Sequence, residues 1–131
     1  MEHVILGIDI GGTSIKAGIL VSGRLQDIRS IHTPALESQE VILESLATFI
    51  ETYLPHAFEG IGIGIPGLVD PQEGIVLGLA NIPSFQYVEL RKFLFGRFDK
   101  GCAAIPRHGR CTQSMVVELD VGMAGCGTIG Q

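Results

Sequence analysis

The sequence has few cysteines, no block of basic residues and no long apolar run, and each absence excludes a class of protein. Its three cysteines are an odd number and all follow residue 100, which argues against a disulfide framework. The formal net charge is −5 without a cluster of Lys and Arg, so nucleic acid is not an expected partner. No apolar run approaches the ~18 residues that span a bilayer, and the N-terminus lacks the basic segment of a signal peptide. We therefore expect a cytoplasmic protein with no membrane partner.

What the chain does contain is apolar material for one small domain or one lobe of a larger protein. It has 131 residues, of which 46% are hydrophobic. A domain of this size buries roughly 68% of the surface that its unfolded chain exposes. A hydrophobic core is therefore within reach of this sequence.

The hydrophobic pattern of the first half predicts a strand meander followed by a helix. Alternation with period 2 predicts three strands, over about 3–10, 14–21 and 24–31. From Ser38 to Leu54 the apolar residues recur at steps of three to four, which predicts an amphipathic helix. Ser38 is the expected N-cap and Pro55 the expected terminator.

The second half predicts shorter elements. Ile61, Ile63 and Ile65 share one face of a strand, and Gly62 leaves the other face bare, either for tight packing or for a ligand. The pattern then predicts a hairpin over 68–77, a helix over 88–95 and a strand over 114–121.

One stretch near the N-terminus combines groups that bind phosphate. Between the first two strands lie Asp9, Gly11, Gly12, Thr13 and Lys16. Successive N–H groups in a glycine turn bind anions, and a neighbouring carboxylate can hold hydrated Mg²⁺. The stretch is not a Walker loop or a dinucleotide fingerprint, because neither spacing is present and a strand follows. It predicts a phosphate-binding hairpin.

The segment from Gly7 to Lys16 resembles the first phosphate motif of the sugar-kinase, Hsp70 and actin superfamily. Within it, the sequence is most similar to the ROK family (repressors, open reading frames and kinases), which includes bacterial glucokinases and N-acetylmannosamine kinases. The segments 62–70 and 79–83 support this similarity, which covers residues 4–98. It implies an α/β fold, the N-terminal lobe of an actin-like ATPase (ribonuclease H-like), with a mixed sheet begun by the three-stranded meander and with flanking helices.

The resemblance also implies a reaction, phosphoryl transfer from ATP to a hydroxyl of a hexose or amino sugar. Asp9 would hold the hydration shell of Mg²⁺ and is the one implied metal residue. The other residues implied at the ATP phosphates are Gly11, Gly12, Thr13 and Lys16. The residues implied at the sugar are Gly64, Pro66, Gly67 and Asn81.

The chain departs from the family pattern after the second predicted helix. There the family has Glu-Asn-Asp-Ala-Asn, whose Asp is the general base, whereas no Asn-Asp pair occurs in this sequence. We therefore expect residues 1–98 to form the lobe and residues 99–131 to be an atypical tail, from a frameshift or a truncation, with no catalytic residue assigned. His108, Cys111 and Cys126 lack the spacing of the family's zinc cluster, and reduced thiols are expected.

Three functions follow from this comparison. The first is the N-terminal lobe of an ATP-dependent sugar kinase, weak or inactive alone. The second is the sugar-sensing domain of a ROK transcriptional regulator, disfavoured because only seven residues precede Ile8, and the third is a non-catalytic remnant. A lobe without its partner exposes apolar surface, so we also expect a homo-oligomer.

Overall fold

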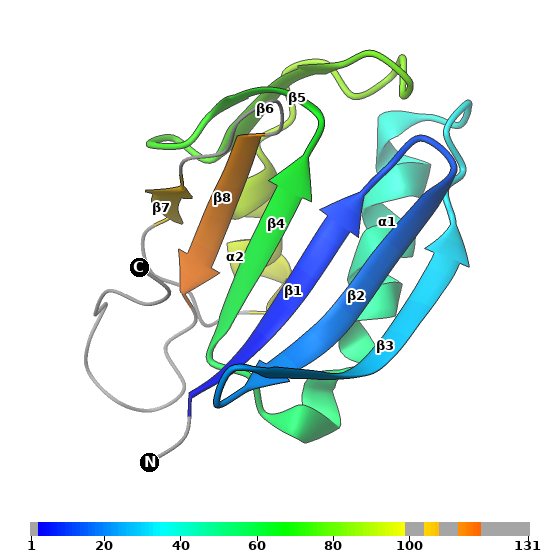
Figure 1. Cartoon of the computed structure of the whole chain (residues 1–131). Helices are drawn as coiled ribbons and strands as arrows, with labels where there is room; N and C mark the ends of the chain where they lie inside the picture. The colour runs from blue at the N-terminus through cyan, green and yellow to red at the C-terminus, as the bar shows by residue number, and fades with distance from the viewer. Residues whose placement is uncertain (1–2, 99–103, 108–112, 119–131) are drawn as a thin grey trace.

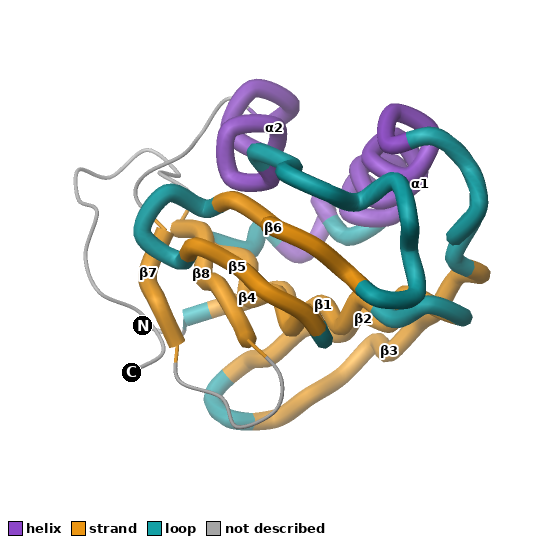
Figure 2. The backbone as a smooth tube through the Cα atoms, turned by 90° about the horizontal axis from the view of Figure 1, so that it is seen from above, coloured by secondary structure: helices purple, strands orange, loops and turns teal. Residues whose placement is uncertain are grey.

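The computed structural model describes residues 3–98, 104–107 and 113–118. A six-stranded sheet forms one layer, and both helices lie on one of its faces (Figures 1 and 2). A separate two-stranded hairpin lies at one end of the sheet (Figure 1). In chain order the elements are β1 (Val4–Ile10), β2 (Ser14–Val21), β3 (Arg24–His32), α1 (Gln39–Glu51), a 3₁₀ turn (Leu54–His56), β4 (Gly60–Ile65), β5 (Gly67–Asp70), β6 (Ile75–Leu79), α2 (Leu90–Phe98), β7 (Ala104–Arg107) and β8 (Gln113–Glu118).

The sheet is mixed, as the resemblance to the ROK family implies. Its strand order is β3-β2-β1-β4-β8-β7, and only the β1–β4 pair is parallel. The carboxyl ends of β1 and β4 therefore point to the same end of the sheet, where the β5–β6 hairpin also lies (Figure 1). This end carries the three sequence motifs.

The core lies between the sheet and the helices. Alternate residues of each central strand face the helices, which is why the period-2 pattern identifies these strands correctly. The face opposite the helices keeps the complementary residues, among them Asp9, which is exposed. The most deeply buried side chains include Leu6, Ile10, Ile15, Ile19, Ile42, Leu46, Ile50, Tyr53, Ile61, Ile63, Ile65 and Phe85.

Helix α1 begins where predicted and ends earlier. The Ser38 side chain accepts a hydrogen bond from the Val41 N–H at 3.3 Å, so it is the N-cap. The helix stops at Glu51 because the Thr52 hydroxyl donates to the Phe49 carbonyl at 2.7 Å, competing for the helical bond. The predicted end at Leu54 is therefore wrong, and Pro55 lies in the 3₁₀ turn that follows.

The later elements also shift by a few residues. Helix α2 begins two residues after the predicted Val88, because Val88 exchanges two backbone hydrogen bonds of 2.8 Å with Val76. Strand β8 covers 113–118 and pairs antiparallel with β4. The predicted continuation to 121 lies outside the described residues.

Candidate functional site

The β1–β2 hairpin places two opposite charges side by side next to its tip, residues 11–13. In the strand register Asp9 lies opposite Lys16, and both side chains are exposed on the face without helices. Neither forms an ion pair within the part of the chain that the structure describes. A carboxylate and an ammonium group are thus both available to a ligand at this end of the sheet.

A buried threonine fixes the shape of the hairpin tip. The Gly11 N–H donates to the Ser14 carbonyl at 3.0 Å, and the Thr33 hydroxyl donates to the Gly11 carbonyl at 2.8 Å. The Thr33 N–H also donates to the Thr13 carbonyl at 2.9 Å, and only 2% of Thr33 is exposed. The sequence analysis misses Thr33, because a single threonine before a proline carries no signal for a contact 22 residues away.

These ties leave phosphate-binding groups free. The N–H groups of Gly12 and Thr13 donate no hydrogen bond to any described residue. Adjacent free amides beside a lysine match the donor set that binds phosphate oxygens, and an exposed carboxylate next to them suits a hydrated hard cation. The residues present therefore fit a Mg²⁺–nucleotide phosphate group.

The end of β4 supplies the second group of predicted residues. Gly64 lies beside Asp9 in the parallel register, and a Cβ added to Gly64 would lie 3.7 Å from the nearer carboxylate oxygen. A Cβ on Gly67 would collide with the Gly78 carbonyl oxygen across the β5–β6 pair. Close strand packing thus accounts for the glycine at 67, and its role toward sugar stays a prediction.

The loop after β6 brings the third motif onto the hairpin tip. A small cavity of about 10 Å³ lies between the segments, and this space holds no more than one water. It is a seam between packed elements. Its lining joins residues predicted for phosphate and for sugar: Ile10, Gly12, Pro66, Leu79, Asn81 and Ile82.

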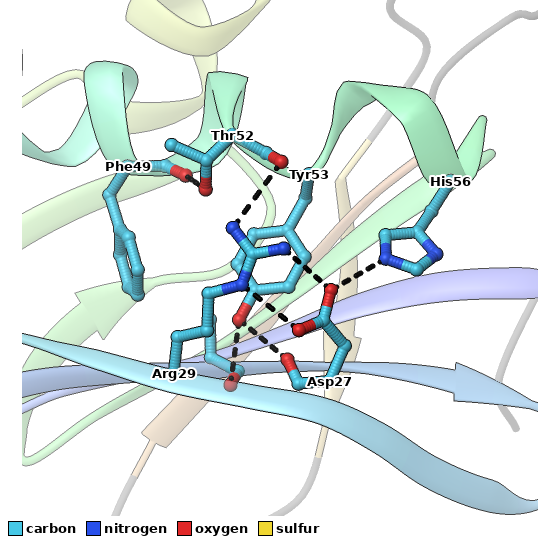
Figure 3. A network of polar contacts seen from close by, with 7 residues as sticks. Asp27, Arg29, Phe49, Thr52, Tyr53 and His56 are labelled. Carbon is cyan, nitrogen blue, oxygen red and sulfur yellow. Dashed lines mark hydrogen bonds and ion pairs between the residues drawn. The ribbon is translucent and has the colours of Figure 1, made fainter.

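A second polar cluster lies away from the tip, at the C-terminal end of α1 (Figure 3). Asp27 has a positive φ of 52° and bonds both Arg29 and His56, at 2.6 and 2.7 Å. The Tyr53 hydroxyl lies 2.8 Å from the Asp27 carbonyl oxygen and 3.1 Å from that of Ala17, so its single proton is shared between these two acceptors. Hydrogen bonds from Arg29 and His56 lower the pKa of Asp27 from 3.8 to about 2. Burial raises the pKa of Tyr53.

A wider groove of about 630 Å³ runs between α1 and β3 and contains none of the predicted site residues. Within the described residues, no three His, Cys, Asp or Glu side chains gather as a metal site. His108, Cys111 and Cys126 lie outside those residues. None of the described helices has the length and apolar character needed to cross a membrane.

The sequence profile of the ROK family matches residues 5–106. The chain belongs to the ROK family. An Escherichia coli N-acetyl-D-glucosamine kinase is 36% identical over 97 residues, which cover 72% of this chain and 31% of that kinase. An uncharacterised protein of Clostridium perfringens is 33% identical over 134 residues, covering 90% of this chain and 45% of its own length. The chain thus spans from about a third to less than half of these relatives.

Solved structures share the fold, that of an actin-like ATPase. The ROK hexokinase of Thermus thermophilus is 33% identical with a TM-score of 0.64, over 73% of this chain and 32% of that one. The ROK glucokinase of Streptomyces griseus, solved with glucose and AMPPNP, is 28% identical with a TM-score of 0.65, over 73% and 30%. A ROK transcriptional regulator is 20% identical with a TM-score of 0.65, over 73% and 26%, which shows the fold alone.

Proposed function

We propose that the described residues form the N-terminal half of a sugar-kinase site, which transfers phosphate from Mg-ATP to a hydroxyl of a hexose or amino sugar. The supporting observation is the convergence of three motifs at one end of the sheet, where Gly12, Pro66 and Asn81 line one seam. The kinases among its ROK relatives act on sugars of this class, as their names state. ATP supplies the phosphoryl group in this reaction.

The polar groups of the hairpin have distinct roles in this proposal. Asp9 holds the water shell of the Mg²⁺ ion, because its exposed carboxylate has no partner among the described residues. The free N–H groups of Gly12 and Thr13 bind phosphate oxygens, Gly11 lines them, and Lys16 adds positive charge. Thr33 keeps the tip in shape for this contact.

The sugar lies beside the hairpin in this proposal. Asn81 is exposed, and its amide makes no hydrogen bond to the described residues, so it can both donate and accept with sugar hydroxyls. Gly64 and Pro66–Gly67 form the adjoining strand end. A general base typically contributes ~10²–10⁴-fold, and this sequence contains no Asn-Asp pair to supply one. We therefore propose that the chain alone binds its ligands with little or no turnover.

Titration of the whole chain with Mg-ATP, glucose, N-acetylglucosamine and N-acetylmannosamine tests this proposal. Amide chemical shifts are the suitable readout, because one lobe binds weakly and each contact is seen separately. We expect Mg-ATP to shift Gly12 and Thr13, and a sugar to shift the Asn81 side chain. Sugar binding without Mg-ATP binding would favour a sugar-sensing domain, and binding of neither would favour a non-catalytic remnant.

We also propose that the chain self-associates through its open sheet face. Leu20, Leu25 and Ile28 are 38%, 57% and 64% exposed there, and apolar patches of this kind find partners in solution. Sedimentation velocity tests this point. A monodisperse monomer at high concentration would contradict it.

A further inference from the structure

The two adjacent glycines of the hairpin tip are not explained by backbone geometry. Neither Gly11 nor Gly12 has a positive φ, unlike Gly23 and Gly74. A Cβ on Gly11 would lie 3.0 Å from the Ser14 carbonyl oxygen, within its own hairpin. A Cβ on Gly12 would lie 2.6 Å from the Cβ of Asn81, a residue 69 positions later. The space that a side chain at position 12 would need is thus already occupied by Asn81.

The Asn81 side chain lies along Gly12. From the position of that added Cβ, the Asn81 Cγ would be 3.4 Å away and its Nδ2 3.6 Å away. The group predicted to bind sugar therefore rests directly on the group predicted to bind phosphate.

Both sides of this contact are anchored. The tip is tied by Thr33, with hydrogen bonds of 2.8 and 2.9 Å. The loop is held by Leu79 and Ile82, which are 6% and 1% exposed, and Gln39 donates to the Ser84 carbonyl at 3.1 Å. Because a separation of 2.6 Å between two carbon atoms is far inside van der Waals contact, a methyl group at position 12 must displace one of the two sides. The pair Ala80–Asn81 is exposed, so we expect it to give way first.

We propose that Gly12 is a positioning residue for Asn81, and that its missing side chain sets the amide that meets the sugar. This inference rests on the proposed function for the identity of the ligand, whereas the steric contact stands by itself. In this proposal the N–H of Gly12 contacts phosphate, and the absence of a side chain at Gly12 serves to orient the sugar through Asn81.

A stability cycle on the whole chain tests the contact without any ligand. The variant Gly12→Ala should lower Tm, and the loss should disappear in Gly12→Ala/Asn81→Gly, which lacks the colliding Cβ. In Gly12→Ala/Asn81→Ala the Cβ remains, so the loss should persist. Gly78→Ala is the matched control, because its Cβ would meet no atom within 4 Å and Gly78 is not a predicted site residue. Equal losses in all three Asn81 backgrounds would overturn the proposal.

Ligand titrations of the same variants test the positioning role. Gly12→Ala and Asn81→Ala should each weaken binding of the best sugar by about tenfold and weaken binding of Mg-ATP by clearly less. The Asn81 side-chain NH₂ signals should shift in Gly12→Ala before any ligand is added. A larger loss for Mg-ATP than for sugar would overturn the proposal. If the parent chain binds no sugar and no Mg-ATP, the proposed function fails, while the stability cycle still decides whether Gly12 seats Asn81.

Discussion

The site around the hairpin tip leaves its polar groups exposed and without partners among the described residues, whereas the cluster at the C-terminal end of α1 pairs its own groups with one another. Asp9, Lys16 and the Asn81 amide belong to the first kind. Asp27, Arg29 and Tyr53 belong to the second, with Arg29 also lying 4.5 Å over the Tyr53 ring (Figure 3). Exposed polar groups without a protein partner are hydrated and remain available to a ligand, whereas groups that pair with one another support the fold.

This contrast separates two chemically similar sites. The α1 cluster contains a carboxylate and a tyrosine with shifted pKa values beside a histidine, and such groups are marks of an active site as well. Its donors and acceptors are directed to one another and to backbone carbonyls, so it holds the irregular strand around Asp27 in place. Substitutions at the hairpin-tip site should therefore change ligand binding, whereas substitutions in the α1 cluster should change stability.

The largest loss of stability should come from Tyr53→Ala. Tyr53 is 0% exposed and its hydroxyl donates to backbone carbonyl oxygen, so removal of the ring should cost about 3–5 kcal/mol of unfolding free energy. Tyr53→Phe keeps the ring and should cost about 1 kcal/mol. Urea unfolding followed by circular dichroism measures both. A Tyr53→Ala variant as stable as the parent would show that the cluster does not support the fold.

Thr33→Val should lower both the stability of the fold and the affinity for Mg-ATP. The variant loses the 2.8 Å bond to the Gly11 carbonyl at a buried position, which should cost about 1–3 kcal/mol. A looser tip should also weaken Mg-ATP binding. The exposed Thr48→Val on α1 is the control and should stay within about 0.5 kcal/mol. Unchanged Mg-ATP binding in a destabilised Thr33→Val would mean that the tip needs no support to bind phosphate.

The sequence predicts those features that depend on local patterns. The strands around Asp9 and the Ser38 cap follow from periodicity and from residue type at neighbouring positions. Other contacts join residues that are far apart in the chain, and no local pattern records them. The separation is 22 positions for Thr33 and Gly11, 36 for Tyr53 and Ala17, and 69 for Gly12 and Asn81. The glycine at 12 shows the limit most clearly, because its partner is set by the packing of a distant loop.

The pH dependence of stability should follow Asp27. The folded pKa of Asp27, about 2, is below its ordinary value of 3.8, so the charged form stabilises the fold above pH 3.8. That contribution should be lost as the pH falls from about 4 through 2. Asp27→Asn should be less stable than the parent at pH 7 and should lose less over the acid range. Thermal unfolding at several pH values measures this, and parallel curves for the two proteins would contradict the assignment.

Asp9→Asn should have the smallest effect on stability and a large effect on binding. The side chain is exposed and has no partner among the described residues, so the free energy of unfolding should change by less than about 0.5 kcal/mol. Mg-ATP affinity should fall by about tenfold, equivalent to about 1.4 kcal/mol, because the amide cannot hold the hydrated cation as a carboxylate does. Glu37→Gln removes an equal charge from an exposed position outside the predicted site and should change neither quantity. A clear loss of stability in Asp9→Asn would remove the distinction between the hairpin-tip site and the α1 cluster, since the charge of Asp9 would then also stabilise the fold.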